Sequence, residues 1–170
     1  MDIDDAVIMN AYWADEIEMA FEEYQKPIIE LNGKPYFGEA LMIDGDSFLD
    51  VIWEQSLTAF DKPREVQVVI DSNLNLFISY GTPGFVSFEH QEEELLDRQK
   101  RMKLPIVCWI HTHPFGAAYF SGTDWNTIRT WEMLMQSAIV LGDNQRMLWT
   151  KERGNHTVFY KNGSLVEEEE

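Results

Sequence analysis

IVCWIHTH, residues 106–113, is the stretch that decides the expected fold. It is rich in β-branched and aromatic residues and stays apolar on both alternating faces until His111. That pattern predicts a strand in the middle of a sheet that is covered on both sides. A loop, PFGAAYF (114–120), and a helical pattern, DWNTIRTWEMLMQS (124–137), follow it. We therefore expect a buried strand, a loop and a helix in that order.

Strand and helix patterns alternate through the rest of the chain. Helical spacing of apolar residues predicts a helix from about Asn10 to Gln25. Asn32-Gly33 between apolar runs predicts a hairpin whose second arm can continue through Glu39 to Ile43. The pattern also predicts a charged helix at 87–103 and strands at 64–71, 75–81, 138–142, 145–152 and 156–163. The expected fold class is α/β, with a mixed β-sheet flanked by helices.

Length and composition indicate one globular domain. The chain has 170 residues, of which 45% are hydrophobic and 25% charged, enough for a single apolar core. We expect one domain over residues 1–166 and an acidic, solvated tail over 167–170. The formal net charge of −17 argues against nucleic acid or an anionic membrane as a partner, because both must be neutralised by Lys and Arg.

Cysteine usage and the terminal sequence predict a cytoplasmic protein. Cys108 is the only cysteine, so the chain can form no internal disulfide and no cysteine-rich zinc site. The first residues, MDIDDAVIMN, lack the basic and apolar regions of a secretory signal, and no apolar run reaches the length of a membrane span.

His111 and His113 stand at the end of the predicted central strand. Residues two apart in a strand point to the same face, about 6 to 7 Å apart, so both imidazoles can converge on one metal ion. A catalytic zinc takes three protein ligands and keeps a fourth position for water. Asp124, returned to the strand end by the loop, can supply the third ligand.

Ser121 and Asp124 also have a structural interpretation. Ser-x-x-Asp before a helix resembles a capping box, with Ser121 as N-cap and Asp124 in the first turn. The two interpretations are compatible, because a capped first turn is a rigid mount for the Asp124 carboxylate. Capping alone does not explain the paired histidines, so we interpret the whole pattern as a metal centre.

The complete pattern, HTHPFGAAYFSGTD (111–124), resembles the signature of the JAMM, or MPN+, zinc metalloproteases, in which His-x-His-Pro, six residues and Ser-x-x-Asp follow an upstream glutamate. Residues 88–114 are similar to the helix and strand that enter this motif in the family, and AIVLGD (138–143) is similar to the strand that follows it. The resemblance implies a single MPN domain, of the cytidine-deaminase-like fold, over nearly the whole chain.

This resemblance implies an enzyme. His111, His113 and Asp124 would bind one catalytic Zn²⁺, and Ser121 would stabilise the tetrahedral oxyanion. The implied activity is that of a deubiquitinase-like isopeptidase or peptidase, which cleaves conjugates of ubiquitin or a ubiquitin-like protein or trims the carrier. Phe115, Tyr119 and Phe120, in the motif loop, are candidates for substrate contact or for packing.

The general base is the open point of the resemblance. The family uses an upstream glutamate on a strand, and Glu39 is our candidate because it begins a predicted apolar strand. Glu30 keeps the family's Glu-x-x-Gly spacing but is followed by KPYF in place of an aliphatic run. Either residue is also consistent with an exposed carboxylate.

Two other classes of protein remain to be weighed. A non-catalytic MPN-type scaffold would bind partner proteins, but such scaffolds typically lack one or more ligands, and this chain has all three. A nucleobase deaminase would pair His-x-Glu with Pro-Cys-x-x-Cys, and neither motif is present. Alternation places Cys108 on the face opposite His111, where a buried apolar role is expected.

Overall fold

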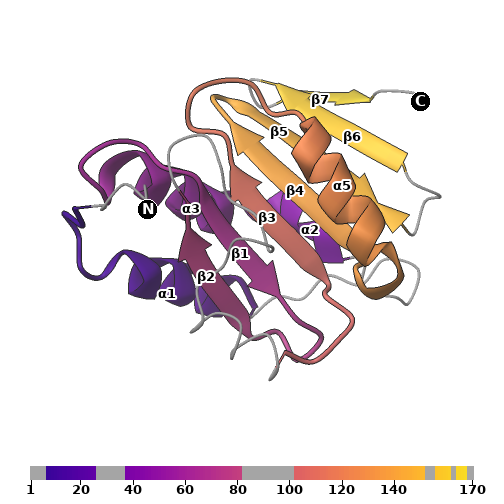
Figure 1. Cartoon of the computed structure of the whole chain (residues 1–170), viewed down its shortest axis with the longest axis horizontal. Helices are drawn as coiled ribbons and strands as arrows, with labels where there is room; N and C mark the ends of the chain where they lie inside the picture. The colour runs from indigo at the N-terminus through magenta and orange to yellow at the C-terminus, as the bar shows by residue number, and fades with distance from the viewer. Residues whose placement is uncertain (1–6, 26–36, 82–101, 152–155, 162–163, 168–170) are drawn as a thin grey trace.

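A computed structural model describes residues 7–25, 37–81, 102–151, 156–161 and 164–167 (Figure 1). The first arm of the predicted hairpin and almost all of the predicted helix at 87–103 lie outside these residues. In chain order the elements are α1 (Trp13–Gln25), α2 (Phe37–Asp44), α3 (Asp46–Thr58), β1 (Val66–Ile70), β2 (Leu76–Tyr80), β3 (Cys108–Thr112), α5 (Gly122–Trp131), the 3-10 turn η2 (Glu132–Leu134), β4 (Ser137–Gly142), β5 (Gln145–Thr150), β6 (His156–Lys161) and β7 (Ser164–Glu167).

The strands form one seven-stranded mixed sheet in the order β2-β1-β3-β4-β5-β6-β7. Only β3 and β4 pair in parallel, and the other neighbours are antiparallel. The α5 helix connects this parallel pair, so β3, α5 and β4 make a βαβ unit at the centre of the sheet. The predicted fold class, a mixed sheet flanked by helices, is confirmed at this level.

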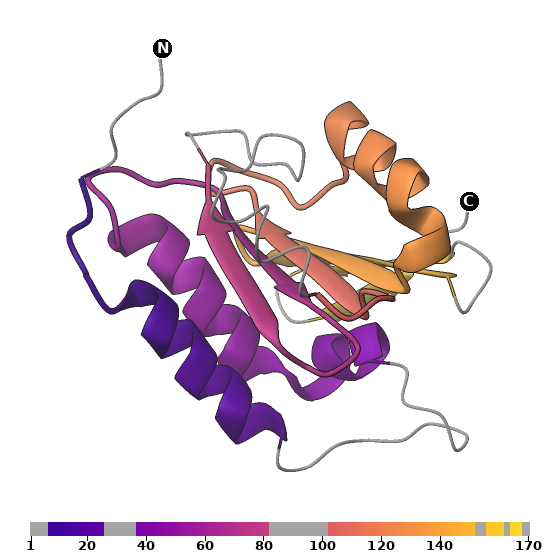
Figure 2. The ribbon, with the colours of Figure 1, turned by 60° about the horizontal axis from the view of Figure 1, so that its bottom comes forward.

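Helices cover both faces of the sheet, as Figure 2 shows: α5 lies on one face, and α1, α2 and α3 lie on the other. Alternating β3 residues separate two apolar cores. Cys108 and Ile110 belong to the core beneath α1 and α3, whereas Trp109 belongs to the core beneath α5. All five residues of β3 are buried, which confirms the prediction of a strand covered on both sides.

The prediction of a strand as the second arm of the hairpin is wrong, because residues 37–44 form the helix α2. FGEALMID has no strict apolar alternation, and Glu39, Ala40, Leu41 and Met42 are all good helix formers. Every residue from Gly38 to Met42 is buried, since α2 packs against α3, β4 and β5. A short apolar run of this kind does not distinguish a strand from a buried helix by periodicity.

Most of the other predicted elements are confirmed. The helix expected from about Asn10 to Gln25 is α1, and the expected strands correspond to β1, β2, β3, β4, β5 and β6. The β7 strand is an addition, and it ends at Glu167, the first residue of the expected acidic tail. Among the helices in the described part of the chain, none has both the length and the apolar character that a membrane crossing requires.

Candidate metal centre

His111 is held at the end of β3, on the face of the sheet that α5 covers. Its ring is fully buried and stacks on the Trp109 indole, with ring centroids 4.5 Å apart and 18° between the planes. The indole Nε1–H donates to Gln67 Oε1 at 2.8 Å, and Gln67 Nε2–H donates to Ser79 Oγ at 3.2 Å. This buried polar network fixes the surface against which the His111 ring lies.

His113 follows directly after β3. Its backbone N–H donates to Leu141 O at 2.8 Å, which extends the parallel pairing of β3 with β4 by one bond. Its side-chain Nδ1 lies 3.3 Å from Ala117 O in the following loop. Because a carbonyl oxygen only accepts, the proton of this bond is on Nδ1, and the Nε2 lone pair of the neutral ring is directed toward Asp124.

Asp124 is held by the predicted capping box at the start of α5. Ser121 Oγ accepts from the Asp124 backbone N–H at 3.1 Å, and Asp124 Oδ2 accepts from the Ser121 backbone N–H at 2.9 Å. The carboxylate is therefore fixed by the first turn of the helix, and it is 4% exposed. Capping and the aiming of a possible ligand are performed by the same residues.

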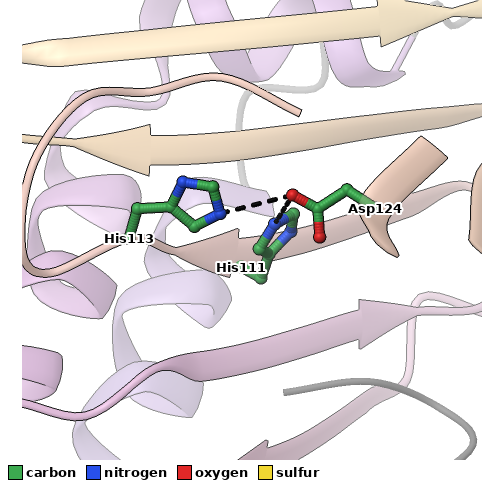
Figure 3. A group of neighbouring side chains, drawn as sticks. All are labelled: His111, His113 and Asp124. Atoms are coloured by element: carbon green, nitrogen blue, oxygen red, sulfur yellow. Dashed lines mark ion pairs between the residues drawn. The ribbon is translucent and has the colours of Figure 1, made fainter. Parts of the chain in front are cut away.

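These three side chains converge on one point (Figure 3). Asp124 Oδ2 lies 3.1 Å from His111 Nε2 and 3.3 Å from His113 Nε2. One potential ligand atom from each of the three residues lies within 4.8 Å of the other two. The structure therefore brings together the three residues that the sequence predicted as ligands.

The cluster fits a metal ion. Both ring nitrogens of His111 are buried without a hydrogen bond in the described part of the chain, so the 3.1 Å approach of Nε2 to Asp124 lacks hydrogen-bond alignment. Imidazole lone pairs and a carboxylate oxygen directed at one point repel one another unless a proton or a cation lies between them. Two imidazoles and one carboxylate are a donor set that divalent transition metals accept.

Electrostatics around the cluster also favour a bound cation. Burial of Asp124 raises its pKa, but the nearby His111 and His113 and the Ser121 N–H lower it more, so the Asp124 pKa lies far below its usual range. Burial lowers the pKa of His113, but the contact with Asp124 and the charges of Asp124 and Glu65 outweigh burial and raise it. Asp124 and Glu65 thus both place negative charge close to the His113 ring.

A cavity of about 360 Å³ opens beside the cluster. Its lining includes His113, Ser121 and Asp124, the exposed aromatic rings of Phe115 and Tyr119, and Glu65. Tyr119 also makes an edge contact with His113, with ring centroids 5.1 Å apart. The cavity gives a substrate direct access to one side of the cluster.

Glu65 is the site residue that sequence reasoning missed. It directly precedes β1, whose register pairs Gln67 with His111, and extending this register by two residues places Glu65 opposite His113. The Val66 N–H donates to Thr112 Oγ1 at 2.9 Å, which ties the two chains together at this point. Glu65 is 6% exposed. The sequence signal was a carboxylate at the start of the predicted strand REVQVVID, but the sequence does not show that this strand lies beside His113.

Glu39 is not brought to the cluster. It lies on α2, on the opposite face of the sheet from His111, and it does not line the cavity. An added Cβ on its neighbour Gly38 would lie 2.6 Å from Ser137 Oγ, at the start of β4, whereas the histidines lie beside the end of β4. Glu30 lies outside the described residues, so its role stays a prediction.

The loop aromatics divide into two groups. Phe115 and Tyr119 are 63% and 54% exposed beside the cavity, where contact with a substrate is possible. Phe120 is buried in the core beneath α5 and packs on Trp125, with ring centroids 5.2 Å apart. Cys108 is buried in the other core, on the face predicted for it.

No model of a protein family matches this chain, and no curated protein sequence matches it either.

Proposed function

We propose that this chain is a JAMM-type zinc metalloprotease with an MPN domain, an isopeptidase or peptidase that acts on conjugates of ubiquitin or a ubiquitin-like protein or trims the carrier. One observation carries the proposal. His111, His113 and Asp124 converge on the edge of a cavity that also contains Ser121 and Glu65. Two imidazoles and a carboxylate as ligands, a hydroxyl donor and a separate carboxylate base together suit hydrolysis of an amide bond.

His111, His113 and Asp124 would hold the zinc ion through the atoms that already face one another. When bound, the zinc supplies Lewis-acid polarisation of the scissile carbonyl and lowers the pKa of a water ligand to about 7. His113 presents Nε2 because Ala117 O accepts from Nδ1. Asp124 remains ionised because the histidines and the Ser121 N–H hold its pKa low.

Glu65 replaces Glu39 in this proposal as the general base. It shares the cavity with Ser121 and Asp124 but is not one of the three converging residues, so its carboxylate serves proton transfer without competing as a ligand. Glu65 accepts a proton from the attacking water and delivers it to the leaving amine, the role that a positioned carboxylate performs in amide hydrolysis.

Ser121 supplies the donor to the developing oxyanion. Its Oγ accepts from the Asp124 N–H, and its own hydroxyl hydrogen donates to no group in the described part of the chain. A hydroxyl that is fixed through its acceptor side and lines the cavity can direct its hydrogen at a carbonyl oxygen. The capping bond therefore holds the oxyanion donor in place.

Phe115 and Tyr119 would contact the polypeptide on either side of the scissile bond, as exposed aromatic rings at a cavity edge. With a net charge of −17, the protein favours a partner that is neutral or basic at the contact. A single cysteine, buried and free, suits the reducing cytoplasm that we propose as its compartment.

Incubation of the protein with isopeptide-linked conjugates of ubiquitin and of small β-grasp carriers tests the activity. We expect cleavage that a zinc chelator abolishes, that added Zn²⁺ restores and that His113→Ala lacks. Stoichiometric zinc in the purified protein is expected as well. Cleavage that survives both the chelator and His113→Ala would refute the mechanism, and zinc binding without cleavage of any conjugate would favour the non-catalytic scaffold.

Three matched Glu→Gln variants identify the base. Glu65→Gln is expected to lower kcat by about 10²–10⁴-fold with zinc content unchanged, because only proton transfer is removed. Glu39→Gln removes the same charge on the other face of the sheet and is expected to retain kcat. Glu30→Gln tests Glu30, the other candidate for the general base. A large loss of kcat in Glu39→Gln or Glu30→Gln, with Glu65→Gln fully active, would overturn the assignment.

A further inference from the structure

The turn between β4 and β5 is in direct contact with the motif loop that follows His113. Asp143 N–H donates to Gly116 O at 2.9 Å, and the Gln145 side chain accepts the Ala118 N–H through Oε1 at 2.9 Å. These two bonds fix the loop backbone on either side of Ala117. The His113 side chain contacts the same stretch of backbone between these two bonds, at Ala117 O.

Gly142 allows this close approach. A Cβ added at Gly142 would lie 2.5 Å from Ala118 N, 2.7 Å from Gly116 O and 2.8 Å from the Ala117 carbonyl carbon. All three are backbone atoms, which cannot move aside as the end of a flexible side chain can. The loop backbone therefore rests directly on Gly142, and any larger residue there would displace it.

Ala117, between the two fixed points, makes the contact that matters for the metal centre. Its carbonyl oxygen lies 3.3 Å from His113 Nδ1 and so selects the tautomer that leaves the Nε2 lone pair directed toward Asp124. Hydrogen bonds to the far nitrogen of a ligand histidine fix its orientation, and their loss typically costs 10–100-fold in metal affinity. The position of the Ala117 carbonyl thus depends on a turn that contains no ligand.

We propose that Gln145 and Gly142 are positioning residues: they hold the 116–118 backbone so that Ala117 sets the tautomer and the direction of His113. This inference rests on the proposed metal centre, and it adds a structural determinant of metal affinity on the β4–β5 hairpin, which contains none of the three ligands. Gln145 acts through a neutral amide oxygen and touches neither the metal nor the substrate.

Metal affinity of purified variants tests this proposal. Zn²⁺ affinity is measured by competition with a chromophoric chelator, and the visible spectrum of the Co²⁺-substituted protein reports the ligand geometry. Gln145→Met keeps the length of the side chain but removes the acceptor, and it is expected to weaken Zn²⁺ binding by roughly 10–100-fold and to alter the Co²⁺ spectrum. Gln145→Glu keeps an oxygen acceptor and is expected to bind Zn²⁺ close to wild type.

Arg146→Met is the matched control. Arg146 is the next residue of β5 and points to the other face, where it pairs with Asp46 at 2.6 Å and Asp50 at 2.9 Å. Arg146→Met therefore perturbs the same strand without touching the loop, and it is expected to leave Zn²⁺ affinity unchanged. Gly142→Ala, checked for folding by circular dichroism, is expected to weaken Zn²⁺ binding at least as much as Gln145→Met. If Gly142→Ala does not fold, the comparison of Gln145→Met with Gln145→Glu tests the proposal alone.

The proposal is overturned if Gln145→Met binds Zn²⁺ as wild type does, if Arg146→Met loses as much affinity, or if Gln145→Glu fails to restore binding. Wild-type protein that binds Zn²⁺ but cleaves no conjugate would refute the proposed function and leave the positioning role intact. Wild-type protein that binds no Zn²⁺ would refute both.

Discussion

The two faces of the sheet differ in the size of their apolar cores and in the polar side chains that are buried beside them. Beneath α1 and α3 the core is apolar and large, with aromatic side chains such as Phe21 and Phe48 packed 4.9 Å apart between ring centroids. Beneath α5 the apolar core is smaller, and His111, Asp124 and Gln67 are buried beside it. Burial of polar groups costs free energy unless they are paired, so the larger apolar core offsets the cost of burying His111, Asp124 and Gln67 on the other face.

Neighbouring residues of β3 provide the largest expected contrast between the faces. Ile110→Ala is expected to lower the free energy of unfolding by about 2–5 kcal/mol, because it leaves a cavity in the larger core, and to retain stoichiometric zinc. His111→Ala is expected to abolish zinc binding and hydrolysis. It should cost less stability in the metal-free protein, because neither nitrogen of the buried ring has a hydrogen bond within the described ranges of the chain.

Urea unfolding of the metal-free variants and zinc content by mass spectrometry measure these two effects. If Ile110→Ala stays folded but loses as much zinc as His111→Ala, then zinc binding depends on the packing of the larger core as well. A larger loss of stability in His111→Ala than in Ile110→Ala would mean that the cluster contributes to folding without metal.

Ser121 caps α5 and, in the proposed function, also donates to the oxyanion, so its variants separate folding from catalysis. Ser121→Ala is expected to lower kcat by about 10²–10³-fold through loss of the oxyanion donor and to cost about 1 kcal/mol of stability through loss of the N-cap. Ser121→Gly should lower kcat equally but cost only a few tenths of a kcal/mol, since glycine is tolerated at the N-cap. Retention of kcat in both variants, measured beside their thermal unfolding, would restrict Ser121 to capping.

Cys108 belongs to the core beneath α1 and α3, and its expected effect appears only above pH 9. Burial raises the pKa of its thiol to about 12, from 9.0 for the free side chain. Above pH 9 the unfolded chain loses this proton and the folded chain keeps it, so this contribution to stability falls by about 1.4 kcal/mol per pH unit until about pH 12. Cys108→Ala should therefore lose stability less steeply than wild type between pH 9 and 11 in urea titrations. Parallel slopes would contradict this expectation.

The elements that were predicted correctly are those that local patterns specify. The apolar run before His111 predicted β3 as a buried strand, and Ser-x-x-Asp predicted the start of α5. The three converging residues could therefore be named from the sequence. All three come from one strand end and one helix start that a short loop joins. The candidate metal centre therefore draws its three ligands from a single continuous stretch of chain.

Glu65 could not be found in the same way, because its place depends on the register between β1 and β3. Those strands are separated in the sequence by β2 and by residues outside the described part, and no local pattern specifies how they pair. Glu39 was chosen because a short apolar run was interpreted as a strand, whereas packing against α3 and the sheet makes it a helix. The positions of both glutamates therefore depend on tertiary contacts, which the local sequence does not specify.

The loop between His113 and Ser121 is fixed at its middle but open on its two sides. Gly116 and Ala118 are bound to the β4–β5 turn, whereas the Phe115 and Tyr119 side chains project into solvent and bear little of the packing. Exchanges at exposed positions usually change stability by less than about 0.5 kcal/mol. The loop can therefore diversify at these two positions through evolution or directed selection while the fold stays as it is, and with the proposed activity such exchanges would alter substrate preference.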